Sequence, residues 1–89
     1  MKTAKINGNE INSRYQLHEK LADSLSFPEW YGRNLDALHD LLTETAEDTT
    51  VIITDFSTLE KKLGRYAQLF RKVISDAAEE NPKIHIEIE

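Results

Sequence analysis

Val51-Ile52-Ile53 is a continuous run of β-branched residues bounded by polar residues, and the rest of the chain is organised around it. Such a run is typical of a strand that is buried on both faces of a sheet. Each end of the chain predicts one further strand. Residues 3–6 suit a short strand that ends at the turn pair Asn7-Gly8, and residues 84–88 alternate strictly between apolar and polar side chains.

Two helices are predicted between the first strand and the central run. Ser13 and Gln16 form a capping box ahead of leucines that recur every four residues. That helix should end near Ser26, because Pro28 disfavours helical geometry at the residue before it. Asn34 is a favourable N-cap for a second helix that runs to about residue 45.

Two more helices are predicted after the central run. Ser57 and Glu60 form a second capping box, which starts a short helix that stops at Gly64. Apolar side chains with helical spacing over residues 65–80 predict an amphipathic helix, and Pro82 closes it. The order is therefore β-α-α-β-α-α-β. Strands joined by helical crossovers favour a parallel sheet, so the fold class is α/β, with a three-stranded parallel sheet and about four helices.

Length and composition indicate one small intracellular domain over residues 1–89. The chain has 89 residues and no cysteine, which excludes disulfides and thiolate metal sites. Its first residues lack the apolar stretch of a secretory signal, and no run approaches the roughly 20 apolar residues that cross a bilayer. We therefore expect a cytoplasmic protein without a membrane partner.

The negative charge of the chain is concentrated in one stretch, between residues 29 and 48. The formal net charge is −5, and this stretch accounts for all of it, with six acids and the single base Arg33. Such a surface would repel nucleic acid and attract a cationic protein. The six acids are Glu29, Asp36, Asp40, Glu44, Glu47 and Asp48.

The second predicted helix separates leucines from carboxylates. At 100° per residue, Leu35, Leu38 and Leu42 face one side, with Leu41 at the margin. The opposite side carries a row that we call the acidic stripe. Like charges at these spacings destabilise a helix by about 0.2–0.5 kcal/mol per pair. No lysine or arginine on the stripe offsets this repulsion, and an uncompensated local cost of this kind indicates a functional surface. An ordinary solvated face is an equally good interpretation of the stripe alone. The acidic stripe consists of Asp36, Asp40, Glu44 and Glu47.

An aromatic-rich segment, residues 27–33, precedes this helix, and we call it the aromatic loop. It contains the adjacent pair Trp30 and Tyr31. Alternation along an extended loop would bury one of the two rings and expose the other. An exposed aromatic beside a row of charges matches the composition of protein–protein hot spots.

These same residues resemble a known family. Phe27-Pro28-Glu29-Trp30-Tyr31-Gly32-Arg33-Asn34-Leu35-Asp36-Ala37-Leu38-His39-Asp40-Leu41-Leu42 resembles the signature of the barstar family. The family pattern is a hydrophobic residue, Pro-Glu, two aromatics, Gly-x-Asn-Leu-Asp-Ala-Leu, an aromatic and Asp, and some 14 of the 16 positions agree with it. Weaker similarity extends over nearly the whole chain.

The resemblance implies a three-stranded parallel sheet and tight inhibition of a basic, guanyl-type extracellular ribonuclease in a 1:1 complex. It implies that Asp40 takes the place of a substrate phosphate in the active site. Two residues depart from the pattern: His39 replaces a tryptophan, and Lys72 replaces a glutamate. The contact residues implied by position are Trp30, Tyr31, Gly32, Asn34, Leu35, Asp36 and Asp40, and we extend the predicted surface to His39, Glu44 and Glu47.

Two other classes of function remain open. A barstar-fold interaction module could bind another cationic protein or toxin, which the departures at His39 and Lys72 favour. An enzyme is the weaker alternative. Asp36, His39 and Asp40 have the helical spacing of a metal site or an acid–base pair, but an exposed helix offers them no cleft. We predict a non-enzyme that binds no metal or cofactor and is a monomer when free.

Overall fold

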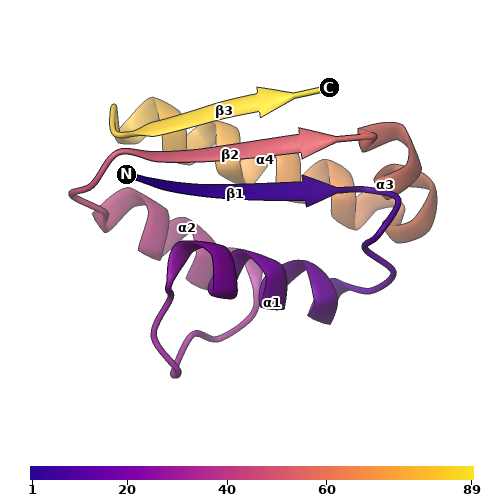
Figure 1. Cartoon of the computed structure of the whole chain (residues 1–89), viewed down its shortest axis with the longest axis horizontal. Coiled ribbons are helices and arrows are strands. Elements are labelled where there is room, and N and C mark those ends of the chain that lie inside the picture. The colour runs from indigo at the N-terminus through magenta and orange to yellow at the C-terminus, as the bar shows by residue number, and fades with distance from the viewer.

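The computed structural model describes residues 1–89, and its elements follow the predicted β-α-α-β-α-α-β order (Figure 1). The helix and strand boundaries agree with the sequence patterns to within two residues. The elements are β1 Lys2–Asn7, α1 Arg14–Leu25, α2 Leu35–Glu44, β2 Thr49–Thr54, α3 Phe56–Leu63, α4 Arg65–Glu80 and β3 Ile84–Ile88.

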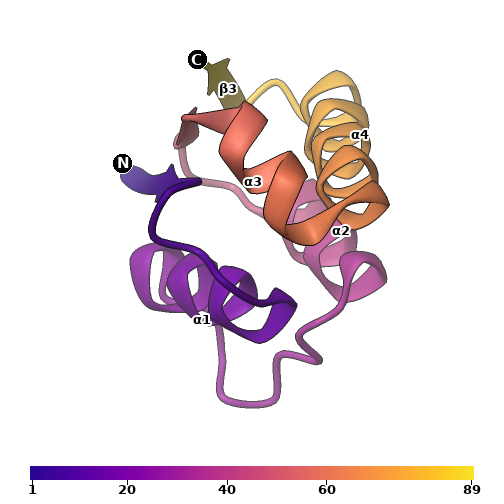
Figure 2. The same cartoon turned by 90° about the vertical axis from the view of Figure 1, so that its right-hand side faces the viewer.

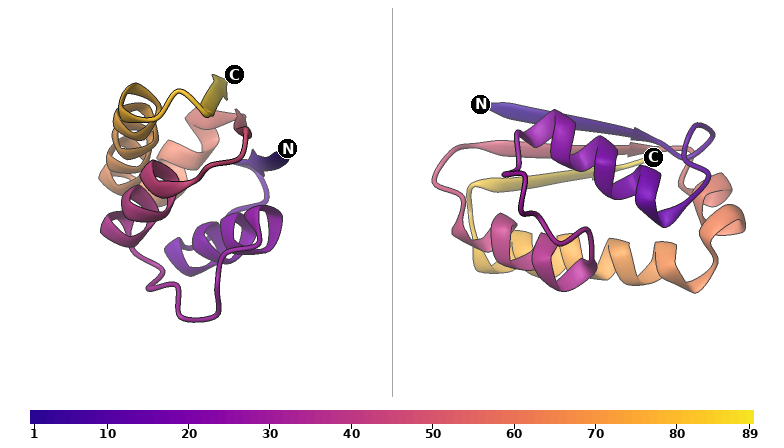
Figure 3. Two further views of the ribbon diagram at one scale, coloured as in Figure 1. Left: turned by 90° about the vertical axis from the view of Figure 1, so that its left-hand side faces the viewer. Right: turned by 90° about the horizontal axis from the view of Figure 1, so that it is seen from below.

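The three strands form one parallel sheet in the order β1-β2-β3, which confirms the predicted fold class. All four helices lie on the same side of it (Figures 2 and 3). Both crossovers step across the sheet in the same direction. Because parallel crossovers nearly always share one hand, both pairs of helices are placed on the same face.

The expectation that the central strand is buried on both faces is therefore wrong. Burial alternates along β2, where Thr49, Val51 and Ile53 are buried and the residues between them are half-exposed. The β-branched composition of the run reflects the central position of β2 in the sheet. The alternating accessibility of β2 and the placement of all four helices on one side show that the other face is open.

The core lies between the sheet and the helices. It contains 18 buried hydrophobic residues, contributed by every helix and strand and by the connections around α1. Helix α1 packs on β1, α4 packs on β3, and α2 packs against α4. Helix α2 therefore lies at the side of the molecule, where its outer surface is free. No helix is long and apolar enough to cross a membrane.

Two of the three predicted N-caps are confirmed. The side chains of Ser13 and Asn34 accept hydrogen bonds from the backbone N–H groups of Gln16 (3.1 Å) and Ala37 (2.8 Å). The predicted cap at Ser57 is wrong, because α3 begins at Phe56 with Asp55 as its N-cap. Asp55 has a left-handed φ of 55°, so the chain turns directly from β2 into α3 and Phe56 enters the core.

Candidate partner-binding surface

The aromatic loop places its two adjacent aromatic rings in opposite environments, as alternation predicted. Tyr31 is buried (2% exposed), and its ring packs against Phe27 at a centroid distance of 4.8 Å. Trp30 is 76% exposed and is one of the few large hydrophobic side chains on the surface. The predicted contact role therefore suits Trp30, whereas the side chain of Tyr31 has almost no free surface and instead supports the loop.

A buried histidine connects Tyr31 to two helices. His18 of α1 is fully buried, and its two ring nitrogens lie 2.6 Å from the hydroxyl oxygens of Tyr31 and of Tyr66 in α4. A neutral imidazole donates at one nitrogen and accepts at the other, and each tyrosine hydroxyl can complement either role. The network ties the aromatic loop to α1 and α4 at one point.

The sequence alone did not identify this network. A single histidine among the leucines of an amphipathic helix does not indicate which polar groups it will contact. The burial of the imidazole lowers the pKa of His18, and the guanidinium of Arg33 lowers it further. Burial raises the pKa of Tyr31 and also that of Tyr66. All three groups are therefore held in their neutral forms.

The only base of the acidic stretch does not neutralise α2. Arg33 folds back towards α1, where its Nη2 lies 3.3 Å from the Glu19 carboxylate and its Nη1 donates to the Tyr31 carbonyl at 3.2 Å. Its φ of 53° is left-handed, which is uncommon for a non-glycine residue. The Arg33 contacts fix the end of the loop and turn its charge away from the acidic stripe.

Three carboxylates of the acidic stripe lie exposed on α2 without an internal partner: Asp36, Asp40 and Glu44. They are spaced four residues apart, which is about 6 Å along the helix axis. Leu38 and Leu42 on the opposite side are buried, and Leu35 and Leu41 are half-buried at the margins. The predicted division of this helix into an apolar side and an acidic side is confirmed.

Glu47 departs from the predicted geometry of the stripe. It lies beyond the end of α2, so it does not continue the row of carboxylates on that helix. Its carboxylate is 2.8 Å from the N-terminal ammonium of Met1 and 3.7 Å from Nζ of Lys2, and these positive groups lower its pKa. Unlike the three α2 carboxylates, Glu47 is paired with positive groups of its own chain.

The two residues that depart from the family pattern both have acidic neighbours on α4. Nε2 of His39 lies 3.2 Å from the Glu80 carboxylate, and Nζ of Lys72 lies 3.4 Å from Asp76. His39 is thus directed towards α4 and away from Asp36 and Asp40. No group of three His, Asp or Glu side chains has the geometry to hold a metal ion.

The remaining predicted contact residues shape the beginning of α2. Asn34 caps the helix, and its side-chain nitrogen donates to the Gly32 carbonyl at 3.3 Å. Gly32 is exposed, and a Cβ there would lie 3.0 Å from that same nitrogen. A hollow of about 270 Å³ lies between the loop and the end of α2, and its lining includes Phe27, Pro28 and Glu44.

Asn81 holds the other end of α2, a role that the sequence did not reveal. It follows α4 and is 7% exposed. Its amide nitrogen donates to the carbonyls of Leu42 and Thr45 at 2.9 Å, with a longer 3.4 Å contact to Thr43. The last turn of a helix leaves its carbonyls without i→i+4 partners, and of these three only the Leu42 carbonyl has a local donor, the Thr45 N–H at 3.4 Å. Asn81 therefore fixes α2 against α4.

Replacing Asn81 with Ala should destabilise the protein measurably. The substitution removes the Asn81 donor from the part-buried Thr43 and Thr45 carbonyls and leaves the Leu42 carbonyl with only the longer bond from Thr45, and an unsatisfied buried polar group costs about 1–3 kcal/mol. We expect the free energy of unfolding, measured by urea denaturation, to fall by that amount. The matched substitution Asn9→Ala, at an exposed position, should change it by less than about 0.5 kcal/mol. Equal effects of the two substitutions would contradict the assigned role of Asn81.

His18 should make stability depend on pH. Its pKa in the folded protein is below the ordinary value of 6.5, so the unfolded chain binds the proton more readily. The contribution of neutral His18 to the free energy of unfolding is fully present when the pH is above that ordinary value, and it is lost as the pH falls below it. Between about pH 7 and pH 5, the free energy of unfolding should fall more steeply for the native protein than for His18→Gln. A slope unchanged in His18→Gln would contradict this prediction.

Comparison with known proteins identifies the family of this chain. The sequence model of the family described as Barstar (barnase inhibitor) matches residues 1–89. A protein of Bacillus subtilis (strain 168), named "Putative ribonuclease inhibitor YrdF", is 41% identical over 76 residues, which cover 84% of each chain. The chain therefore belongs to the Barstar family, whose members are inhibitors and not enzymes.

Proposed function

We propose that this protein inhibits a basic ribonuclease in the cytoplasm of the cell that makes the enzyme, by covering its active site with the aromatic loop and α2. The observation that carries the proposal is the set of three exposed carboxylates, Asp36, Asp40 and Glu44, which no positive group of the chain neutralises. Family membership and the name of the B. subtilis relative support the same role.

The physical basis is charge mimicry. A ribonuclease binds its substrate through cationic side chains that contact phosphates, and those side chains are incompletely neutralised in the empty enzyme. Carboxylates repeated along one side of α2 present negative charge at intervals similar to those of an RNA backbone. Opposite charge on the two proteins accelerates association, and the desolvated charge pairs then slow dissociation. Inhibition follows from occupation of the active site, without any chemistry by this chain.

The same surface is held rigidly before binding. Asn34 caps the beginning of α2, Asn81 binds its end, and His18 anchors the loop through Tyr31. A rigid surface loses less conformational entropy on association than a mobile one, so more of the interaction energy contributes to affinity. Trp30 adds the apolar area that charge pairs lack.

A direct test combines capture and inhibition. The immobilised protein should retain a basic ribonuclease from the producing organism at low salt and release it at high salt. The purified enzyme should lose activity on adding one equivalent of this protein, and barnase serves as a first test enzyme. If this protein neither captures nor inhibits any ribonuclease, the proposal is wrong.

A second candidate is an interaction module that binds a cationic protein other than a ribonuclease. His39 and Lys72, which replace a tryptophan and a glutamate of the family pattern, favour this candidate. The same capture experiment separates the two functions. Salt-dependent recovery of a cationic protein that has no ribonuclease activity would support the module.

A further inference from the structure

The outer edge of β3 is open, and its unpaired backbone groups are regularly placed. On the inner side, the carbonyl of Lys83 accepts from Thr49 N–H at 2.9 Å, and the N–H of Glu89 donates to the Ile53 carbonyl at 2.7 Å. Because alternate residues of a strand direct their backbone groups the same way, the isoleucines of β3 direct theirs to the free edge. Of these groups, the N–H of Ile84 already donates to the Asn81 carbonyl at 3.0 Å.

The side chains of this segment are self-complementary when two copies run in opposite directions. The segment reads Lys83-Ile84-His85-Ile86-Glu87-Ile88-Glu89, with bases in its first half, acids in its second half and isoleucines between them. In an antiparallel pair centred on Ile86, each His85 lies opposite Glu87 of the other copy, and each Lys83 lies opposite Glu89. Each isoleucine then lies opposite an isoleucine.

We propose that β3 pairs with β3 of a second copy of this chain. The two β3 strands run antiparallel to each other and join the two parallel sheets into one continuous sheet. Charge determines the register. A shift of two residues in one direction places Glu87 opposite Glu87, and like charges directly opposite each other destabilise a strand pair. A shift of two residues in the other direction places His85 opposite His85 and leaves it without a carboxylate from the other copy. A shift of one residue would move the isoleucines of one copy to the solvent face.

The geometry of the edge suits this pairing. Lys83, His85, Glu87 and Glu89 direct their backbone groups towards β2. They therefore form the non-hydrogen-bonded positions of the β3–β3 pair, where opposing side chains approach most closely. His85 and Glu87 occupy such positions on the open face of the sheet, and both are exposed. His85 also lies 3.4 Å from Asp48 of its own chain, so an acid is present on each side of it in the pair.

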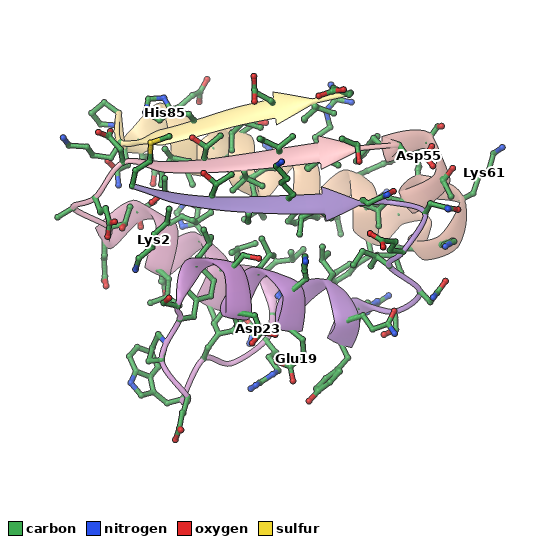
Figure 4. All side chains as sticks on the ribbon, in the orientation of Figure 1. Lys2, Glu19, Asp23, Asp55, Lys61 and His85 are labelled. Carbon is green, nitrogen blue, oxygen red and sulfur yellow. The ribbon has the colours of Figure 1, made fainter.

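The pairing leaves the proposed inhibitory surface free. β3 lies at the opposite side of the molecule from the aromatic loop, as Figures 1 and 4 show with His85 labelled on β3. A dimer would therefore present two separate sites. The opposite edge, β1, lacks this self-complementarity, because its charged residues Lys2 and Lys5 are both basic. The predicted free monomer would then describe only the dilute protein.

Charge reversal on β3 tests the pairing directly. Sedimentation velocity of the full chain from micromolar to millimolar concentration should show a concentration-dependent dimer. Glu87→Lys places lysine opposite His85, and His85→Glu places glutamate opposite Glu87, so each variant should raise the dimer dissociation constant about tenfold or more. The control Asp23→Lys, an equal charge change on an exposed position of α1, should leave it unchanged.

The mixture of the two variants gives the sharpest result. Combined in equal amounts, the Glu87→Lys and His85→Glu chains make every opposing pair complementary in this register, whereas a shift of two residues in either direction leaves one like-charge pair. They should therefore form a heterodimer although each alone is monomeric. A native protein that stays monomeric at millimolar concentration, or a mixture that does not associate, would overturn the proposal. Ribonuclease inhibition is measured separately on the same variants and should be unaffected.

Discussion

Asp40→Ala should weaken binding of the target ribonuclease by about 2–5 kcal/mol, the loss typical when one member of a desolvated charge pair is removed. Asp40 is the middle member of the three exposed α2 carboxylates, and no positive group of its own chain competes for it. The affinity is measured by titration calorimetry or from inhibition curves, with barnase or with the captured ribonuclease.

Stability should change in the opposite direction to affinity. Asp40 has like-charged neighbours one turn away on both sides, Asp36 and Glu44, and each such pair destabilises a helix by about 0.2–0.5 kcal/mol. Asp40→Ala should therefore leave the free protein as stable as before or slightly more stable. Such a result would mean that the Asp40 side chain contributes to binding of the partner and not to the stability of the fold.

The control for Asp40 is Asp23→Ala, the same substitution at an exposed position of α1. It should leave affinity within about 0.5 kcal/mol of the native value, because Asp23 lies outside the loop and the stripe. If Asp23→Ala and Asp40→Ala weaken binding equally, the effect is one of overall charge, and the proposed position of α2 in the active site is wrong.

Trp30→Ala is expected to have the second large effect on affinity, about 2 kcal/mol or more. An aromatic ring that is 76% exposed contributes little to folding, so its burial against a partner is the main contribution that the substitution removes. The free energy of unfolding should stay nearly unchanged. Trp30→Phe should retain part of the affinity, since it keeps an aromatic surface at the same point of the loop.

Tyr15 of α1 provides the matched control for Trp30. Its ring is 61% exposed on α1, and the Arg33 guanidinium of the loop lies 5.7 Å from the ring centroid. Tyr15→Ala should weaken binding much less than Trp30→Ala, whereas an equal loss from both substitutions would indicate that any exposed aromatic ring contributes to binding. A large fall in stability for Trp30→Ala would instead show that the ring supports the fold, and its assignment to the partner surface would be withdrawn.

The acidic stripe shows both the strength and the limit of a periodic pattern. Its members Asp36, Asp40 and Glu44 were placed correctly on the outer side of α2, because the leucines opposite them have one favourable place, the core. Glu47 was predicted from the same period and lies elsewhere. The helix ends before it, and the pairing of Glu47 with Met1 and Lys2 brings together residues from distant parts of the chain.

The sequence by itself determined the fold class, the element order, the exposure of one loop aromatic and the separation of leucines from carboxylates on α2. Each of these depends on residues close together in the chain, through hydrophobic periodicity, helix capping and the burial of apolar side chains by the hydrophobic effect. Only the tertiary structure decided which sheet face is open, how Asn81 and His18 support the site, and which acids keep their charge free. These features depend on polar groups that are far apart in the sequence and adjacent in space. A local sequence pattern does not predict which of these groups will contact each other.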